Sequence, residues 1–134
     1  NNVVTLKDQN RWRSISVASA KQCGRTVLPT VNEISCFPEF LDTANRINDQ
    51  NLILVEPSSG SLDIDIKTSE SLRDIARPDT ACILVGPEGG WTSGEINQAI
   101  DSNFSAITLG PRTLRSETVP LVALAILRFV WDDL

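Results

Sequence analysis

The amino-acid sequence predicts an α/β fold in which helices flank a parallel sheet. Three short apolar runs, 52–55, 81–85 and 104–109, have the length and composition of buried parallel strands. Segments with helical periodicity separate these runs, and such alternation is typical of parallel sheets. With 134 residues, of which 41% are hydrophobic and 22% charged, the chain is expected to form one domain over residues 1–134.

Two segments before the first strand show helical spacing. In residues 10–23, Trp12 and Ile15 share one face, and Gly24 follows as a plausible stop. In residues 37–47, apolar side chains recur at helical spacing and a proline stands near the first turn. Both segments are therefore predicted to be helices.

The segments between the strands carry weaker signals, with one exception. Apolar residues alternate between positions 62 and 66, which predicts a minor edge strand, and residues 69–76 are compatible with a short helix. After the second strand, Thr92 is followed three residues later by Glu95, the pattern of a capping box. A helix is therefore expected to begin directly after Thr92.

The last segment, 117–131, reads as a helix whose apolar residues cover nearly its whole circumference. A helix of this kind is buried on more than one side. In a domain this small, one of those sides is expected to face another subunit, which predicts a homodimer. The alternative is a central helix of a monomer.

Composition excludes several classes of function. The formal net charge of -5 argues mildly against nucleic-acid binding by the surface as a whole. The absence of histidine excludes a serine–histidine triad and most zinc sites. Three cysteines without a C-x-x-C pair predict reduced thiols in the core of a cytosolic protein, with no disulfide and no metal site. The longest apolar run, 119–131, is too short to span a membrane.

Ligands of open parallel sheets bind beyond the carboxyl ends of the strands, where this chain has the loops 56–60, 86–91 and 110–116. The second loop is rich in glycine but lacks the spacing of a dinucleotide fingerprint and the lysine of a P-loop. By itself it indicates no more than a tight strand-to-helix turn. In the third loop, Arg112 and Arg115 precede a helix start and could bind an anion.

Two alternatives stay open for these cations. Arg115 could instead pair with Glu117 or Glu88 as part of the scaffold. Arg25, which follows the first predicted helix, is an isolated cation of a kind that usually lies solvated at the surface.

Three motifs in order resemble one known family. The sequence carries Leu-Val-Gly-Pro-Glu-Gly-Gly-Trp at 84–91 and Leu-Gly-Pro-Arg-Thr-Leu-Arg-Ser-Glu-Thr at 109–118, and upstream it has Gln-Cys-Gly-Arg at 22–25. Together they resemble the RsmE family of ribosomal RNA methyltransferases, in the SPOUT superfamily. The resemblance implies a carboxyl-terminal trefoil knot, a homodimer, and S-adenosylmethionine (SAM) as cofactor. The implied reaction is methylation of N3 of a uridine in 16S ribosomal RNA of the small subunit.

The resemblance also implies site residues. Those expected at the cofactor lie on the three loops: Val55, Glu56, Pro57, Val85, Gly86, Pro87, Glu88, Gly89, Gly90, Leu109, Gly110, Leu114 and Arg115. RNA contacts are expected from Arg25, Arg112 and Arg115. For catalysis, Arg25 or Arg115 would stabilise the N3 anion, and Glu88 or Glu117 would orient the base or accept its proton.

Family members carry a β-barrel RNA-binding domain before the methyltransferase domain, and this chain shows no such segment. It also has no methionine, even at position 1, so we expect an amino-terminally truncated piece of a longer product that binds RNA weakly. Other readings are a SPOUT methyltransferase with another target nucleotide, a non-catalytic dimeric ligand-binding domain, or a flavodoxin-like module.

Overall fold

The computed structural model describes residues 6–57 and 64–132. The chain forms two compact units, residues 1–36 and 37–134. The single domain over residues 1–134 therefore stays a prediction.

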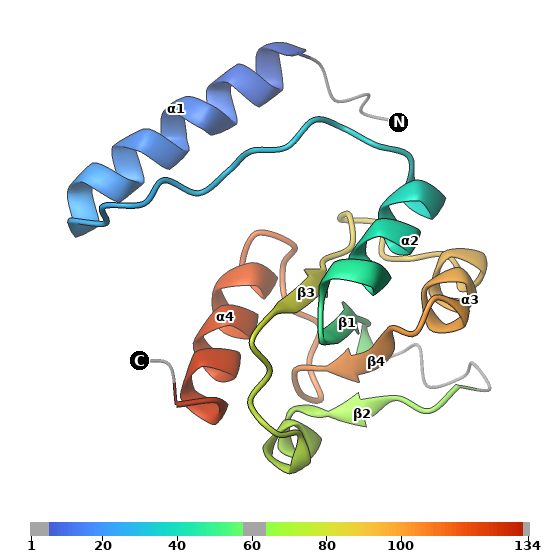
Figure 1. Ribbon diagram of the computed structural model, residues 1–134. Coiled ribbons are helices and arrows are strands. Elements are labelled where there is room, and N and C mark those ends of the chain that lie inside the picture. The colour runs from blue at the N-terminus through green and yellow to red at the C-terminus, as the bar shows by residue number, and fades with distance from the viewer. Residues whose placement is uncertain (1–5, 58–63, 133–134) are drawn as a thin grey trace. The chain divides into compact units, whose positions relative to one another are not determined.

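The first unit consists of one long helix and an extended return segment. Helix α1 (Leu6–Cys23) begins before the expected start at residue 10 (Figure 1). It ends where expected, because Gly24 takes a φ of +72°, a left-handed conformation that glycine adopts without strain. The Ser16 hydroxyl donates a hydrogen bond of 3.2 Å to the Pro29 carbonyl and ties the return segment to the helix.

The second unit is built on a parallel sheet, which confirms the predicted fold class. Within the described residues its strands are β1 (Gln50–Leu54), β2 (Lys67–Thr68), β3 (Ala81–Leu84) and β4 (Ser105–Thr108), in the spatial order β2-β4-β1-β3. All the pairings are parallel. β1 is central, and its Ile53 lies opposite Leu84 of β3 and Ala106 of β4.

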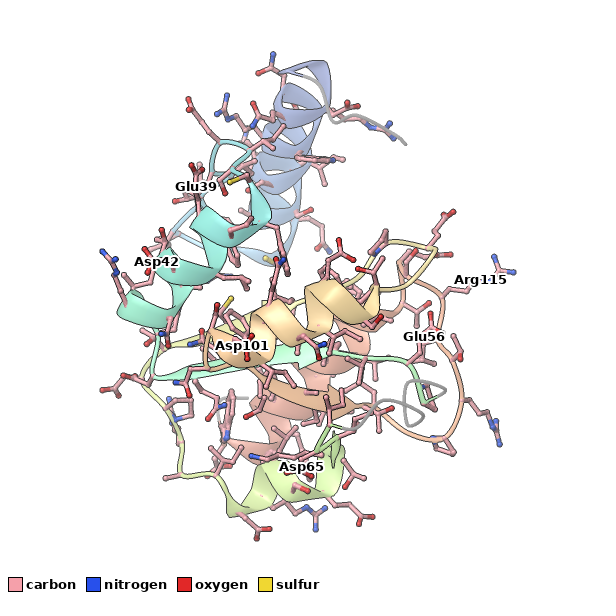
Figure 2. The ribbon with its side chains drawn as sticks, turned by 90° about the vertical axis from the view of Figure 1, so that its right-hand side faces the viewer. Glu39, Asp42, Glu56, Asp65, Asp101 and Arg115 are labelled. Carbon is pink, nitrogen blue, oxygen red and sulfur yellow. The ribbon has the colours of Figure 1, made fainter. Side chains whose placement is uncertain are left out.

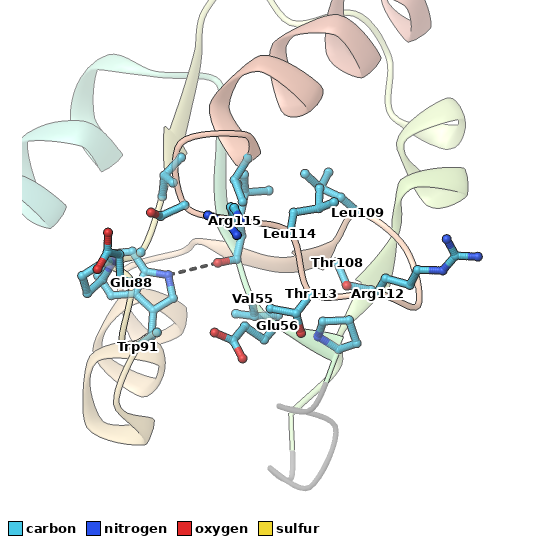
Figure 3. A pocket seen from close by; sticks show the side chains of 18 of the residues that line it. Val55, Glu56, Glu88, Trp91, Thr108, Leu109, Arg112, Thr113, Leu114 and Arg115 are labelled. Carbon is cyan, nitrogen blue, oxygen red and sulfur yellow. Dashed lines mark hydrogen bonds between the residues drawn. The ribbon is translucent and has the colours of Figure 1, made fainter.

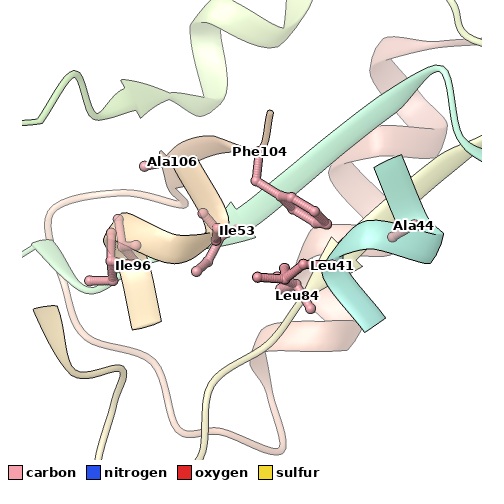
Figure 4. Packing of buried hydrophobic residues seen from close by; sticks show 9 residues of the cluster. Leu41, Ala44, Ile53, Leu84, Ile96, Phe104 and Ala106 are labelled. Atoms are coloured by element: carbon pink, nitrogen blue, oxygen red, sulfur yellow. The ribbon is translucent and has the colours of Figure 1, made fainter. Parts of the chain in front are cut away.

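Helices cover both faces of this sheet. Because alternate side chains of a strand point to opposite faces, Ile53 and Val55 join one core cluster and Leu52 and Leu54 the other. The first cluster contains residues of α2 (Phe37–Ile47) and α3 (Ser93–Asp101), and Figure 4 shows its interlocking side chains. The second contains residues of the 3₁₀ helix η2 (Ser69–Asp74) and of α4 (Val119–Val130).

The sequence predicted some of these elements correctly and others only in part. Helix α2 has the predicted bounds, and the capping box of α3 is present: Thr92 accepts from the Glu95 N–H and donates its own N–H to the Glu95 carboxylate. The expected short helix is a 3₁₀ helix that ends at Asp74. Of the expected edge strand at 62–66, Leu62 lies outside the described residues, and Ile64 and Ile66 precede β2.

The closing helix differs from the prediction at its start. It begins at Val119 rather than at residue 117, because the Arg115 carbonyl accepts hydrogen bonds from the Thr118 and Val119 N–H groups and forms a separate turn. In the single chain it is also buried on one side only, through Ala123 and Leu127. The alternative, a central helix of a monomer, therefore does not fit the isolated chain, and the second subunit that was expected to cover the other side stays a prediction. Among the described residues, no helix combines the length and apolarity that crossing a membrane requires.

The cysteines also depart from the expectation of core thiols. All three are unpaired, but Cys23 and Cys36 are exposed and only Cys82 of β3 is partly buried. Burial raises the pKa of the Cys82 thiol above its ordinary value. Because the thiolate is the reactive form, a raised pKa lowers the reactivity of Cys82 at neutral pH.

We therefore expect a thiol-specific disulfide reagent at pH 8 to modify Cys23 and Cys36 quickly. The rate of modification of Cys82 should be lower by a factor of about ten or more. Absorbance of the released thiol would resolve the two phases. In the Cys82→Ser variant only the slow phase should disappear. A single rate for all the thiols would contradict this assignment.

Candidate functional site

A pocket of about 470 Å³ lies at the carboxyl ends of the three longer strands. Its walls are the segments that follow β1, β3 and β4, as expected for a parallel sheet (Figure 3). The lining residues are Leu54, Val55, Glu56, Pro57, Val85, Gly86, Pro87, Glu88, Gly90, Trp91, Thr108, Leu109, Arg112, Thr113, Leu114, Arg115, Ser116, Glu117 and Val119.

The pocket brings together most of the residues singled out from the sequence. The exceptions are Gly89 and Gly110, which do not line it, and Arg25, which belongs to the first unit. Six lining residues were not predicted: Leu54, Trp91, Thr108, Thr113, Ser116 and Val119. The part of the first loop beyond Pro57 lies outside the described residues.

The glycine-rich loop forms a tight turn against the end of β1. The Gly90 N–H donates to the Pro87 carbonyl at 2.9 Å, and Gly90 has a φ of +72°. A Cβ atom on Gly90 would lie 3.0 Å from Oε1 of Glu56, so the carboxylate of Glu56 lies against this turn. Gly89 is different, because a Cβ atom there would meet nothing within 4 Å.

Trp91 joins this turn to the first strand. Its indole Nε1 donates a hydrogen bond of 3.0 Å to the Leu54 carbonyl, drawn as the dashed line in Figure 3. Its ring lies close to Gly86, where a Cβ atom would come within 3.0 Å of Nε1. On the α2 side, the ring centroids of Trp91 and Phe37 are 5.5 Å apart. The only signal in the sequence was the position of Trp91 directly after the glycines.

The third wall is held by hydrogen bonds to its own backbone carbonyls. Gly110 has a φ of +143°, and its carbonyl accepts a hydrogen bond of 3.1 Å from the Thr108 hydroxyl. The Arg115 carbonyl accepts from the N–H groups of Thr118 at 2.8 Å and Val119 at 3.1 Å. These contacts let Gly110 shape the loop although it does not line the pocket.

The charged groups of the third wall are exposed. Figure 2 shows Arg115 and Glu56 at the same end of the sheet, with the Arg115 side chain extending away from the ribbon. Figure 3 shows the Arg112 guanidinium pointing away from the other labelled side chains. Across residues 6–57 and 64–132, Arg115 forms no salt bridge, so the alternative in which it pairs with Glu117 or Glu88 as scaffold is contradicted.

The lining therefore offers both signs of charge beside apolar surface. Three acidic residues, Glu56, Glu88 and Glu117, line the pocket together with Arg112 and Arg115. Such a lining suits a ligand that carries positive and negative groups on an organic framework. In the described part of the chain, no group of three or more metal-binding side chains is placed to hold an ion.

Comparison with known proteins identifies relatives along most of the chain. A family model described as an RNA methyltransferase domain matches residues 2–128. The chain is 30% identical over 123 residues to the ribosomal RNA small subunit methyltransferase E of Bacillus subtilis. It is 35% identical over 115 residues to the protein of the same name from Synechocystis. These alignments cover 92% and 86% of this chain, and 47% and 36% of the relatives.

Solved structures of methyltransferases also resemble this chain. A ribosomal RNA small subunit methyltransferase E from Neisseria gonorrhoeae, bound to S-adenosyl methionine, superposes with a TM-score of 0.76 at 35% identity. A putative methyltransferase from Legionella pneumophila, in complex with SAM, superposes with a TM-score of 0.80 at 28% identity. The matches cover 98% and 96% of this chain, and 52% and 50% of those chains. The chain thus spans about half of these relatives or less.

The two adjacent glycines of the turn should respond differently to alanine. Gly90→Ala adds a side chain at positive φ and against Glu56, so we expect it to lower the free energy of unfolding by about 1–2 kcal/mol. Gly89→Ala has open space and should change it by less than about 0.5 kcal/mol. Urea denaturation of both variants measures the difference. Equal losses would contradict the geometry described for Gly90.

Proposed function

The chain belongs to the RNA methyltransferase domain family, and we propose that it transfers a methyl group from SAM to N3 of a uridine in 16S ribosomal RNA. The observation that carries this proposal is the pocket whose walls are the three loops at the strand ends, two of which carry the motifs at 84–91 and 109–118. The names of the relatives support a ribosomal RNA substrate of the small subunit. The N3 position rests on the family resemblance of the motifs.

The chemistry of the pocket fits SAM. Its volume of about 470 Å³ is in the range of pockets that hold small organic cofactors. SAM carries a sulfonium, an ammonium and a carboxylate beside its adenosine, and the lining offers carboxylates, guanidiniums and apolar surface. Two structural neighbours contain SAM, which supports the same ligand here.

We assign the cofactor to the three strand ends. Val55, Glu56 and Pro57 would line one side, and the turn from Gly86 to Gly90 would hold the methionine part. The segment after β4 would hold the adenosine, largely through backbone groups of Leu109, Gly110, Leu114 and Arg115. Because these groups belong to short loops anchored on strands, they are arranged before the ligand arrives, which lowers the entropy cost of binding.

Methyl transfer needs an aligned and deprotonated acceptor. When bound, SAM supplies a methyl group that its sulfonium already activates. N3 of uridine becomes a nucleophile when its proton leaves, and the resulting charge spreads over the flanking carbonyl oxygens. We assign stabilisation of that charge to the guanidinium of Arg115 or Arg25. Glu88 and Glu117 are the carboxylates assigned to orient the base or accept its proton.

RNA binding must be local, because the chain has a formal net charge of -5. Arg112 and Arg115 are exposed at the mouth of the pocket and would contact the phosphates around the target base. Arg25 in the first unit is the third proposed contact. A ribosomal substrate implies a cytoplasmic location.

The exposed side of α4 supports the proposed homodimer. Leu121, Leu124 and Phe129 are 71%, 52% and 67% exposed, and their spacing places them on one side of the helix. A second copy of the chain that covers this apolar side would remove it from water. The same helix packs its other side under the sheet, through Ala123 and Leu127.

Calorimetric titration with S-adenosylhomocysteine, the product of methyl transfer, tests the cofactor. Transfer of labelled methyl groups to unmethylated small ribosomal subunits then tests the reaction, and mass spectrometry locates the methyl group. A folded chain that binds no S-adenosylhomocysteine would contradict the cofactor assignment. A methyl group on another nucleotide would replace the proposed target by the alternative of a related methyltransferase.

Arg115→Ala should lower the transfer rate about 100-fold or more, because it removes the cation proposed to stabilise the developing charge. Binding of S-adenosylhomocysteine should weaken less than about threefold, since backbone groups are proposed to hold the adenosine. Arg46→Ala is the matched control, because Arg46 forms an exposed salt bridge with Asp42 on α2, away from the pocket. Unchanged turnover in Arg115→Ala would remove Arg115 from the mechanism.

Leu124→Glu should convert a dimer into monomers, because it introduces a charge into the apolar side of α4. Light scattering after size-exclusion chromatography measures the mass. Ile47→Glu provides the control, since Ile47 is 66% exposed at the end of α2. A monomeric parent chain, or a Leu124→Glu variant that stays dimeric, would contradict this interface.

A further inference from the structure

One peptide group at the end of β1 is held from both sides. The Val55 N–H donates to the Ile107 carbonyl of β4 at 2.9 Å. The Leu54 carbonyl, in the same peptide group, accepts from the Trp91 indole at 3.0 Å. Because no peptide bond of the described residues is cis, the N–H and C=O of this group point in opposite directions. β4 and Trp91 therefore hydrogen-bond to this peptide group from opposite sides.

The indole takes the place of a missing strand partner. The pairing of β1 with β3 ends at Ile53 opposite Leu84, and the chain then turns away through Gly86. The Leu54 carbonyl would otherwise lose its partner on the β3 side, where leaving a partly buried carbonyl unpaired is costly. Trp91 extends the hydrogen bonding of the sheet by one group, with a side chain in place of a strand.

Gly86 makes room for this indole. A Cβ atom at Gly86 would lie 3.0 Å from Nε1 of Trp91 and 3.2 Å from both Cδ1 and Cε2. Gly86, unlike Gly90, does not have a positive φ, so space and not backbone conformation requires glycine there. Phe37 packs on the indole with an interplanar angle of 30° and limits how far the ring can shift.

We propose that Trp91 is a positioning residue that sets the spacing between two walls of the cofactor pocket. The indole links the turn after β3, which it directly follows, to the peptide that leads into Val55, Glu56 and Pro57. Both walls contribute lining residues, so their spacing determines how well a ligand is held between them. This inference rests on the proposed SAM site. It attributes the need for a glycine at position 86 to the fit of Trp91, and leaves the backbone of the turn to hold the ligand.

Binding of S-adenosylhomocysteine to substituted chains separates these two roles of Gly86. Gly86→Ala should weaken binding more than about tenfold in the parent chain, because the new methyl group displaces the indole. In a Trp91→Ala background, where the indole is gone, the same change should cost less than about twofold further. If the ligand itself required glycine, the penalty would be the same in both backgrounds. That result would overturn the assignment.

Trp91→Phe tests the hydrogen bond with the aromatic packing retained. We expect the dissociation constant for S-adenosylhomocysteine and the KM for SAM to rise about three- to tenfold, with little change in kcat. A merely structural role would lower the active fraction, and hence kcat, without moving either constant. Trp131→Phe is the matched control, because Trp131 is also partly buried and its Nε1 has no hydrogen-bond partner among the described residues. Equal behaviour of the two variants would overturn the proposal.

Hydrogen exchange of the indole N–H groups tests the contact without any ligand. In the unliganded chain labelled with ¹⁵N-tryptophan, the Trp91 N–H should exchange much more slowly than that of Trp12, which is 43% exposed. Fast exchange at Trp91 would refute the hydrogen bond between its indole and the Leu54 carbonyl. Slow exchange in a folded chain that binds no S-adenosylhomocysteine would instead refute the proposed cofactor site and leave the contact intact, so the two failures are distinguishable.

Discussion

The central place of β1 in a parallel sheet is the constraint on which the pocket depends. β1 pairs with β3 on one side and with β4 on the other, so the carboxyl ends of all three strands meet at one edge. A short loop follows each strand at that edge, so the three loops lie next to one another. Residues far apart in the sequence, such as Glu56 and Gly90, become neighbours for this reason.

Periodicity and composition predicted the sheet because burial on both faces leaves a continuous apolar run. Helix α2 was found this way, since its apolar face is packed as the pattern implied. β3 was found as a strand, but it lies at an edge of the described sheet, and only its Leu84 is fully buried. The start of α4 was not found, because it depends on the Arg115 carbonyl, a backbone acceptor without any sequence signature. The trefoil knot and the dimer, which the family resemblance implies, stay predictions.

In the candidate site, too, the sequence predicted some features and missed others. Its loops were predictable because each directly follows an apolar run with the composition of a strand, and ligands of parallel sheets bind beyond the strands' carboxyl ends. Trp91 was missed because its partner, the Leu54 carbonyl, is 37 residues away and belongs to the backbone. Gly110 does not line the pocket, and its carbonyl accepts the Thr108 hydroxyl, so its assignment to the cofactor stays a prediction. Sequence motifs therefore located the loops more reliably than the role of each residue within them.

The glycines of the turn show why a motif can be right as a whole and ambiguous at each position. Gly90 is needed for its positive φ, Gly86 for the space that an indole occupies, and Gly89 meets neither demand. A glycine-rich loop beside a pocket is usually attributed to close approach of a ligand, yet two of these glycines already have reasons within the protein. The loop is thus shaped by its attachment to β1 before a ligand is considered. Affinity in such a site depends on how rigidly the walls are joined as well as on what they touch.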